Sequence, residues 1–131
     1  MTTRQTIEAY FNALESGRGW QALLSEDLEF TSFSSPVKTI VGKEAFLEGT
    51  KRFYSMLDRM EVRGLIVEGD RGCALTRYEL RAPDGRTFSS DVAEIFSVRG
   101  DKITSLGIYF DTAPYPARRT EAERSPAPAG S

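Results

Sequence analysis

The spacing of apolar residues is mainly helical in the first part of this chain and alternates as in strands in the second part, and this change limits the folds available to it. Up to about residue 57, apolar residues recur every three or four positions, as in amphipathic helices. Further on they alternate with polar residues, as in half-buried strands. Because helical segments come first and strand segments follow, the sequence predicts an α+β fold with helices packed on one face of an antiparallel sheet.

The helical half begins with a clear start signal. Thr2 and Gln5 match a capping box, and Gly17 supplies a stop. Four apolar residues at helical spacing lie between them: Ile7, Tyr10, Phe11 and Leu14. A second helix is expected over residues 43–57, where the stripe consists of Phe46, Thr50, Phe53 and Leu57. A short amphipathic turn at 20–24 and a short strand at 28–33 are expected between the two helices.

Four strand-like segments follow, at residues 62–68, 73–81, 87–98 and 102–110. The connections contain Gly-Asp, Asp-Gly and Gly-Asp pairs that favour tight turns, so the strands should form a consecutive antiparallel meander. From residue 117 the chain contains Pro, Ala and charged residues without apolar periodicity. We therefore expect one domain at 1–116 and a disordered tail at 117–131.

Composition narrows the class of protein. With 17 basic and 19 acidic residues and no basic block in the body of the chain, nucleic-acid binding has little support. The single cysteine, Cys73, excludes an internal disulfide, which favours a reducing compartment. No apolar run approaches the roughly 18 residues of a membrane-spanning helix, and the start MTTRQT lacks a signal-peptide core. We expect a cytoplasmic protein that does not contact a membrane.

The chain contains no histidine. This excludes triads and zinc sites that require His, so acid–base chemistry would have to use carboxylates, tyrosines, lysines or the thiol. Glycine-rich phosphate loops, clusters of metal ligands and nicotinamide fingerprints are absent from the sequence, and we expect no cofactor and no metal.

Alternation places one carboxylate on an apolar face. In segment 87–98, Glu94 shares a face with Val92 and Phe96, and in the preceding strand Tyr78 points to the same interior. Glu94 is either a structural carboxylate paired with an Arg or a tyrosine hydroxyl, or a functional group with a raised pKa. The last strand has apolar residues on both faces, which predicts a homodimer.

Other candidates have a structural interpretation beside the functional one. Tyr10 is either a core aromatic or a hydroxyl donor in a pocket, and Trp20 is more typical of a core residue. Asp27 and Asp111 are more typical of turns, although Asp111 is kept as a possible site residue.

The order of several short sequences resembles a known superfamily. IEAYFNAL, WQALLSEDLEF, VGKEAF and DVAEIFSVRGDKITSLGIYFD follow one another as in the SnoaL-like branch of the nuclear transport factor 2-like superfamily, over about residues 3–115. The resemblance implies a cone-shaped, curved antiparallel sheet wrapped around N-terminal helices, often dimeric, with a pocket at the open end. Members include ketosteroid isomerase, polyketide cyclases, limonene epoxide hydrolase and proteins that only bind or assemble, so the fold does not fix the function.

Compared with ketosteroid isomerase, Tyr10 falls at the position of the oxyanion tyrosine and Glu94 near the protonated oxyanion acid. The isomerase's general base is replaced here by Ser32, which argues against steroid isomerisation. The resemblance also places Phe110 on a pocket-lining aromatic position, while alternation places Tyr78 on the cavity wall. The ligand-binding wall is expected to consist of Trp20, Ser32, Phe53, Tyr78, Val92 and Phe110.

We therefore expect a small-molecule pocket protein, with Glu94 and Tyr10 as catalytic residues of an acid–base isomerase or cyclase acting on an apolar carbonyl compound. The alternative is a non-catalytic ligand-binding or dimerisation module of the same fold. A protein-transport adaptor has no specific residues to support it. An epoxide hydrolase is disfavoured because Arg77 and Arg81 are predicted to point outward.

Overall fold

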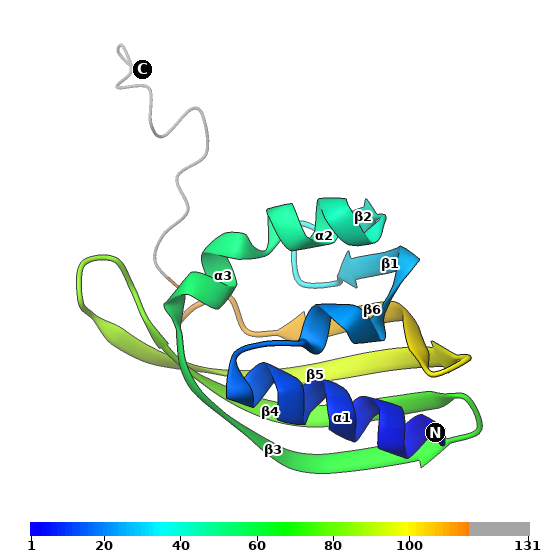
Figure 1. Cartoon of the computed structure of the whole chain (residues 1–131). Helices are drawn as coiled ribbons and strands as arrows, with labels where there is room; N and C mark the ends of the chain where they lie inside the picture. Colours follow the sequence, from blue (N-terminus) through cyan, green and yellow to red (C-terminus); the bar gives the residue numbers. More distant parts are fainter. Residues whose placement is uncertain (116–131) are drawn as a thin grey trace.

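Six strands form one mixed, curved sheet in the computed structural model, which describes residues 1–115 (Figure 1). The predicted tail at 117–131 lies outside the described residues. The elements in chain order are α1 (Thr3–Ser16), a 3-10 turn η1 (Trp20–Leu23), β1 (Leu24–Ser32), β2 (Lys38–Val41), α2 (Lys43–Gly49), α3 (Lys51–Met56), β3 (Leu57–Glu68), β4 (Arg71–Arg81), β5 (Thr87–Arg99) and β6 (Lys102–Phe110). The predicted α+β fold, a curved sheet around N-terminal helices, is confirmed.

Helix α1 begins and ends as the sequence predicts. The Thr2 side chain accepts a hydrogen bond from the Gln5 backbone at 3.0 Å, and the Gln5 side chain accepts one from the Thr2 backbone at 2.9 Å. Gly17 ends the helix in the left-handed conformation, with φ of 87°. A side chain is disfavoured in this conformation, which explains the glycine.

The second predicted helix is interrupted: α2 ends at Gly49 and α3 starts at Lys51. Thr50 between them has φ of −106° and ψ of 3°, outside the helical range. A Cβ at Gly49 would lie 2.9 Å from Cδ1 of Ile40, so the glycine allows the end of α2 to approach β2 closely. Glycine also has low helix propensity, so the prediction of one continuous helix was wrong at this point.

Strands β3 to β6 form the predicted antiparallel meander. Strand β2, which was not predicted, pairs antiparallel with β1 at the edge of the sheet. Within residues 1–115 the one parallel pair joins β1 to β6, so the first and the last described strands lie side by side and the sheet is mixed rather than wholly antiparallel as predicted.

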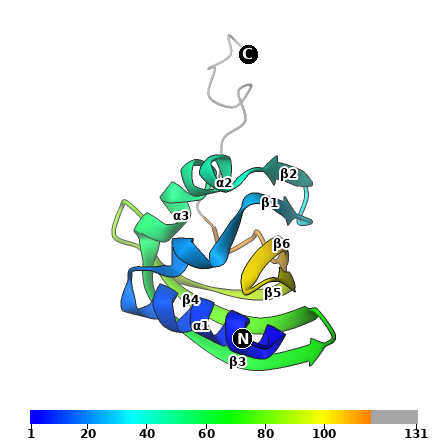
Figure 2. The same ribbon diagram turned by 45° about the vertical axis from the view of Figure 1, so that its right-hand side comes forward.

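The two faces of the meander have different neighbours. Helix α1 lies on the inner face of β3, β4 and β5 (Figure 2). A Cβ at Gly72 would lie only 2.5 Å from Cδ1 of Ile7, and the ring of Phe96 packs edge-on against Tyr10 and Phe11 of α1. The inner face therefore forms the core, and the neighbouring residues of each strand point to the outer face. No helix within residues 1–115 has the length and apolar character needed to span a membrane.

Candidate functional site

Glu94 lies near the middle of β5 with its side chain on the inner face of the sheet. Its direct neighbours across the ladder are Ala74 of β4 and Ile108 of β6, and Ile108 in turn lies opposite Ser32 of β1. Only 4% of Glu94 is exposed. A carboxyl group in such a place loses its hydration, so its charged form is disfavoured unless partners replace the water.

Tyr78 provides the one hydrogen bond to Glu94 among the described residues. Its hydroxyl donates to Oε2 at 2.7 Å, from a position four residues past Ala74 on the neighbouring strand β4. The ring of Tyr78 is held edge-on by Phe53 of α3, with centroids 5.3 Å apart. Packing therefore fixes the hydroxyl that orients the carboxyl.

Two further tyrosines lie beside this pair. The hydroxyls of Tyr10 on α1 and Tyr54 on α3 are 3.3 Å apart. Trp20 packs against Tyr54 with ring centroids 4.7 Å apart, and its ring meets Tyr10 edge-on. Tyr54 was not predicted as a site residue, although it lies four positions after Thr50 of the helical stripe predicted for residues 43–57.

The pKa values of these groups follow from burial. Burial raises the pKa of Glu94 to about 7, and the hydrogen bond from Tyr78 opposes that rise. Burial also raises the pKa of Tyr10, Tyr54 and Tyr78 well above the usual value for tyrosine, with a further rise from the nearby Glu94 carboxylate. At neutral pH the three phenols therefore remain hydrogen-bond donors, while Glu94 can exist in both protonation states.

Some hydrogen-bonding groups of the site have no partner among residues 1–115. In the Tyr10–Tyr54 pair one hydroxyl donates and the other accepts, so one O–H has no acceptor among residues 1–115. Thr76 is buried beside Glu94 and contributes to lowering the pKa of the carboxyl, but its Oγ1 has no partner with hydrogen-bond geometry. Buried polar groups rarely stay unpaired, so this site has capacity for a water molecule or a polar ligand atom.

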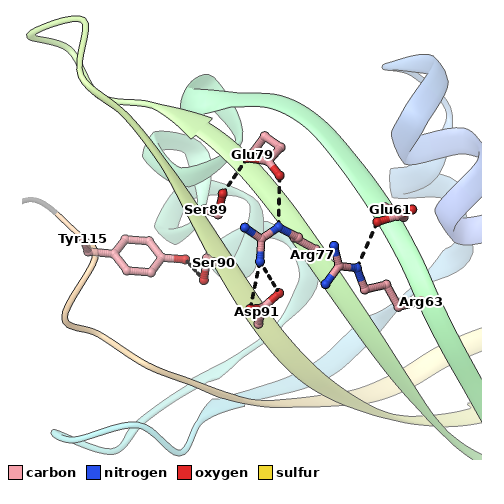
Figure 3. Close-up of polar contacts among 8 residues, drawn as sticks. All are labelled: Glu61, Arg63, Arg77, Glu79, Ser89, Ser90, Asp91 and Tyr115. Carbon is pink, nitrogen blue, oxygen red and sulfur yellow. Dashed lines mark hydrogen bonds and ion pairs between the residues drawn. The ribbon is translucent and has the colours of Figure 1, made fainter.

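No salt bridge to Glu94 occurs within the described part of the chain. Arg77 instead points to the outer face, where it pairs with Glu79 and Asp91 (Figure 3). Residues 1–115 also contain no group of three His, Cys, Asp or Glu side chains placed to hold a metal ion. Of the structural interpretations of Glu94, the pairing with a tyrosine hydroxyl is the one present.

Comparison with protein families decides which family this arrangement belongs to. Residues 7–106 match the model of the SnoaL-like domain, which covers most of the chain. The chain belongs to the SnoaL-like domain family. No curated protein matches the sequence.

Solved structures support the same fold for this SnoaL-like domain. A nuclear transport factor 2-like protein from Burkholderia thailandensis is 19% identical with a TM-score of 0.76, and one of unknown function from Cytophaga hutchinsonii is 22% identical with a TM-score of 0.69; each comparison covers 87% of this chain and 94% of the other. TerC, co-crystallised with polyporic acid, is 21% identical with a TM-score of 0.73, covering 85% of this chain and 92% of TerC.

The other residues predicted to line a ligand pocket in this SnoaL-like domain lie on strands β1, β5 and β6. Val92 is buried on β5 opposite Phe110 of β6. The backbone of Phe110 is fixed by Ser34, whose hydroxyl donates to its carbonyl at 2.6 Å and accepts from its N–H at 2.9 Å. Ser32 lies in the same ladder row as Glu94, two strands away. Asp111 is exposed and accepts a hydrogen bond from the Ala113 N–H, as a turn residue does.

The segment after β6 brings a residue that the sequence did not predict. The Tyr115 ring packs edge-on against Phe88 and Phe110. Its hydroxyl donates to Ser90 at 2.9 Å (Figure 3). Ser90 lies directly opposite Tyr78 in the sheet. Tyr115 therefore adds a fourth phenol to the side of the site near Tyr78.

An open hollow of about 440 Å³ lies away from this cluster. Its lining residues are Asp58, Arg59, Glu79, Leu80 and Thr87. None of them is a predicted site residue, and we place the candidate site at Glu94 instead.

Proposed function

We propose that this SnoaL-like domain binds a small, largely apolar carbonyl compound beside Glu94 and transfers a proton on it. Glu94 is the single acid–base residue in this proposal, and the Tyr10–Tyr54 pair donates a hydrogen bond to the carbonyl oxygen. Tyr78 orients the carboxyl, while Trp20, Phe53 and the neighbouring apolar residues supply the wall.

The proposed step needs only these groups. The Glu94 carboxylate removes a proton from the carbon next to the carbonyl. The electron pair of the broken C–H bond forms the C=C bond of the enolate, and the π pair of the C=O bond moves onto the oxygen. The uncommitted phenol O–H of the Tyr10–Tyr54 pair stabilises the resulting enolate. The neutral carboxyl then returns the proton to the same or another carbon, which gives exchange, isomerisation or the first step of ring closure.

The observation that carries this proposal is the state of Glu94. A buried carboxyl with a pKa raised to about 7, hydrogen-bonded to a phenol and free of any salt bridge within residues 1–115, is suited to take and return a proton at neutral pH. A carboxylate that served only to balance a buried cation would show a lowered pKa.

Exchange of protons next to a carbonyl tests the proposal directly. Neutral cyclic ketones that carry hydrogen on the carbon next to the carbonyl are incubated with the protein in D2O and followed by NMR. We expect protein-dependent loss of the α-proton signal with at least one ketone. Glu94→Gln should slow it by about 100-fold or more, as expected for removal of a general base.

Glu29→Gln is the matched control because Glu29 is an exposed carboxylate on β1. It should exchange at the wild-type rate. Equal exchange by wild type and Glu94→Gln would contradict the assignment of Glu94.

A non-catalytic binding module is the second candidate, and one observation favours it. Tyr10 is fully buried, and its ring meets Phe11, Trp20 and Phe96 edge-on, as in a packed core. If a ketone binds, with NMR shifts at site residues, but no exchange occurs in the wild type, this second function replaces the first.

A further inference from the structure

A buried hydroxyl beside Glu94 has no hydrogen-bond partner within residues 1–115. It belongs to Thr76 of β4, which is only 2% exposed. Thr76 lies directly opposite Val92 of β5, two residues before Glu94, so the side chains of Thr76 and Glu94 are diagonal neighbours on the inner face of the sheet. A buried oxygen without a partner has lost its hydration without replacement, which costs free energy unless the oxygen has another use.

The Glu94 carboxyl also has an oxygen without a partner. Tyr78 donates to Oε2, while Oε1 takes part in no hydrogen bond within the described residues. Each salt bridge in that part of the chain joins other residues, so no cation compensates the carboxylate. Two adjacent side chains, Thr76 on β4 and Glu94 on β5, therefore both have hydrogen-bonding capacity left over.

A threonine hydroxyl can serve both protonation states of a neighbouring carboxyl, because it has one O–H donor and two acceptor lone pairs. It donates to the charged carboxylate and accepts the O–H of the neutral acid. The change requires only rotation about O–H bonds, so Thr76 keeps its own hydrogen and no heavy atom has to move. The β-branched side chain is stiff at χ1, and pairing of β4 with β5 fixes the backbone on both sides of it.

We propose that Thr76 is a positioning residue for Glu94, whose hydroxyl donates to the carboxylate, accepts from the neutral acid and so holds the carboxyl in one orientation in both states. Tyr78 holds one oxygen of the carboxyl, and Thr76 holds the other. A base that takes a proton and later returns it must keep its orientation between the two steps. The part of Thr76 in proton transfer rests on the function proposed above, whereas its hydrogen bond to Glu94 does not.

The other titratable groups around Glu94 stay neutral while it titrates. They are phenols from four parts of the chain: Tyr10 of α1, Tyr54 of α3, Tyr78 of β4 and Tyr115 after β6. Burial, with a smaller effect of the Glu94 charge, raises the pKa of each phenol above its usual value. Across the ladder on β6 and β1 lie Ile108 and Ser32, which do not titrate. A shift in the Glu94 titration on removal of the Thr76 hydroxyl therefore reports that hydroxyl.

Carbon-detected NMR of labelled glutamate tests the hydrogen bond, with the Glu94 signal identified by its loss in Glu94→Gln. Thr76→Val keeps the shape of the side chain but deletes the hydroxyl. The carboxylate then loses a charge-assisted hydrogen bond and the neutral acid a weaker one, so the midpoint should rise by about one pH unit. Thr76→Ser keeps the hydroxyl and should titrate close to the wild type. Thr31→Val is the control, because the Thr31 hydroxyl on β1 contacts the exposed Thr39 instead.

A midpoint that does not rise in Thr76→Val, or that rises equally in Thr76→Ser, overturns the proposal, because the hydroxyl is then not the cause. The pH profile of α-proton exchange in D2O tests the part in proton transfer, and its midpoint should move upward in Thr76→Val together with the NMR midpoint. An exchange profile that stays in place overturns that part. If the wild type exchanges no ketone, the proposed function fails, and the NMR titration still decides whether Thr76 holds Glu94.

Discussion

Tyr78 and Glu94 face each other from neighbouring strands, with the phenol hydroxyl donating to the buried carboxyl at 2.7 Å. Burial favours the neutral form of Glu94, while this hydrogen bond favours the charged form, and the balance leaves the pKa at about 7. The two residues therefore act as one unit.

The free energy of unfolding should depend on the ionisation of Glu94. The pKa of this group is about 7 in the folded chain and near 4.5 in the unfolded one, so between these pH values the folded state binds more protons. Stability should therefore fall as pH rises from 4.5 through 7, by about 3 kcal/mol in total. Urea denaturation of wild type and Glu94→Gln at several pH values measures this. The difference in free energy of unfolding between wild type and Glu94→Gln should fall as the pH rises. A difference that does not change with pH contradicts the raised pKa.

Removing the Tyr78 hydroxyl should move the titration of Glu94 upward. Tyr78→Phe keeps the ring but deletes the donor that stabilises the carboxylate, so the pKa should rise above about 7. Carbon-detected NMR of labelled glutamate gives the midpoint. Tyr109→Phe on the outer face serves as the control and should leave the midpoint in place. A lower midpoint in Tyr78→Phe would mean that the hydroxyl does not donate to Glu94.

Tyr10 and Tyr54 should be coupled in a double-mutant cycle. Their hydroxyls are 3.3 Å apart, and each is the other's only hydrogen-bond partner in the described part of the chain. Tyr10→Phe or Tyr54→Phe should each cost about 1–3 kcal/mol, because the remaining hydroxyl loses its partner. The double variant should cost less than the sum. Thermal or chemical denaturation of the four proteins measures the coupling, and strict additivity would contradict the contact.

Gly72 should not tolerate a side chain. A Cβ there would lie 2.5 Å from Cδ1 of Ile7, which is fully buried. Gly72→Ala should lower the free energy of unfolding by about 1–3 kcal/mol through overpacking. Gly64→Ala is the control in the neighbouring strand, since its Cβ would meet Leu75 at an ordinary 3.6 Å. Ile7→Val removes the clashing atom, so adding it to Gly72→Ala should recover part of the lost stability. A Gly72→Ala variant as stable as the wild type would contradict the close packing.

Local signals in the sequence were enough for much of the fold. The capping box of α1, its glycine stop and the alternating strands of the meander depend on neighbouring residues, so they could be predicted from the chain alone. The same alternation put Glu94 and Tyr78 on one face, which the structure confirms with a direct hydrogen bond.

Other features depend on contacts between distant parts of the chain. The parallel pairing of β1 with β6 and the break after Gly49 follow from tertiary packing, which no periodicity reports. Tyr115 lies beyond the last strand, where the pattern gives no direction to a side chain. The spacing of Tyr54 from Thr50 fits the helical stripe predicted for residues 43–57. Its place in the site depends on the contact with Tyr10, which forms only when α1 and α3 meet.

The position of β6 has a consequence for synthesis on the ribosome. Strand β6 lies between β1 and β5, although it follows both of them in the chain. Until about residue 110 leaves the exit tunnel, the β1–β2 pair and the β3–β5 sheet have no strand to join them. A nascent chain that has formed these two parts exposes an open edge on each, which can pair with other chains until β6 emerges.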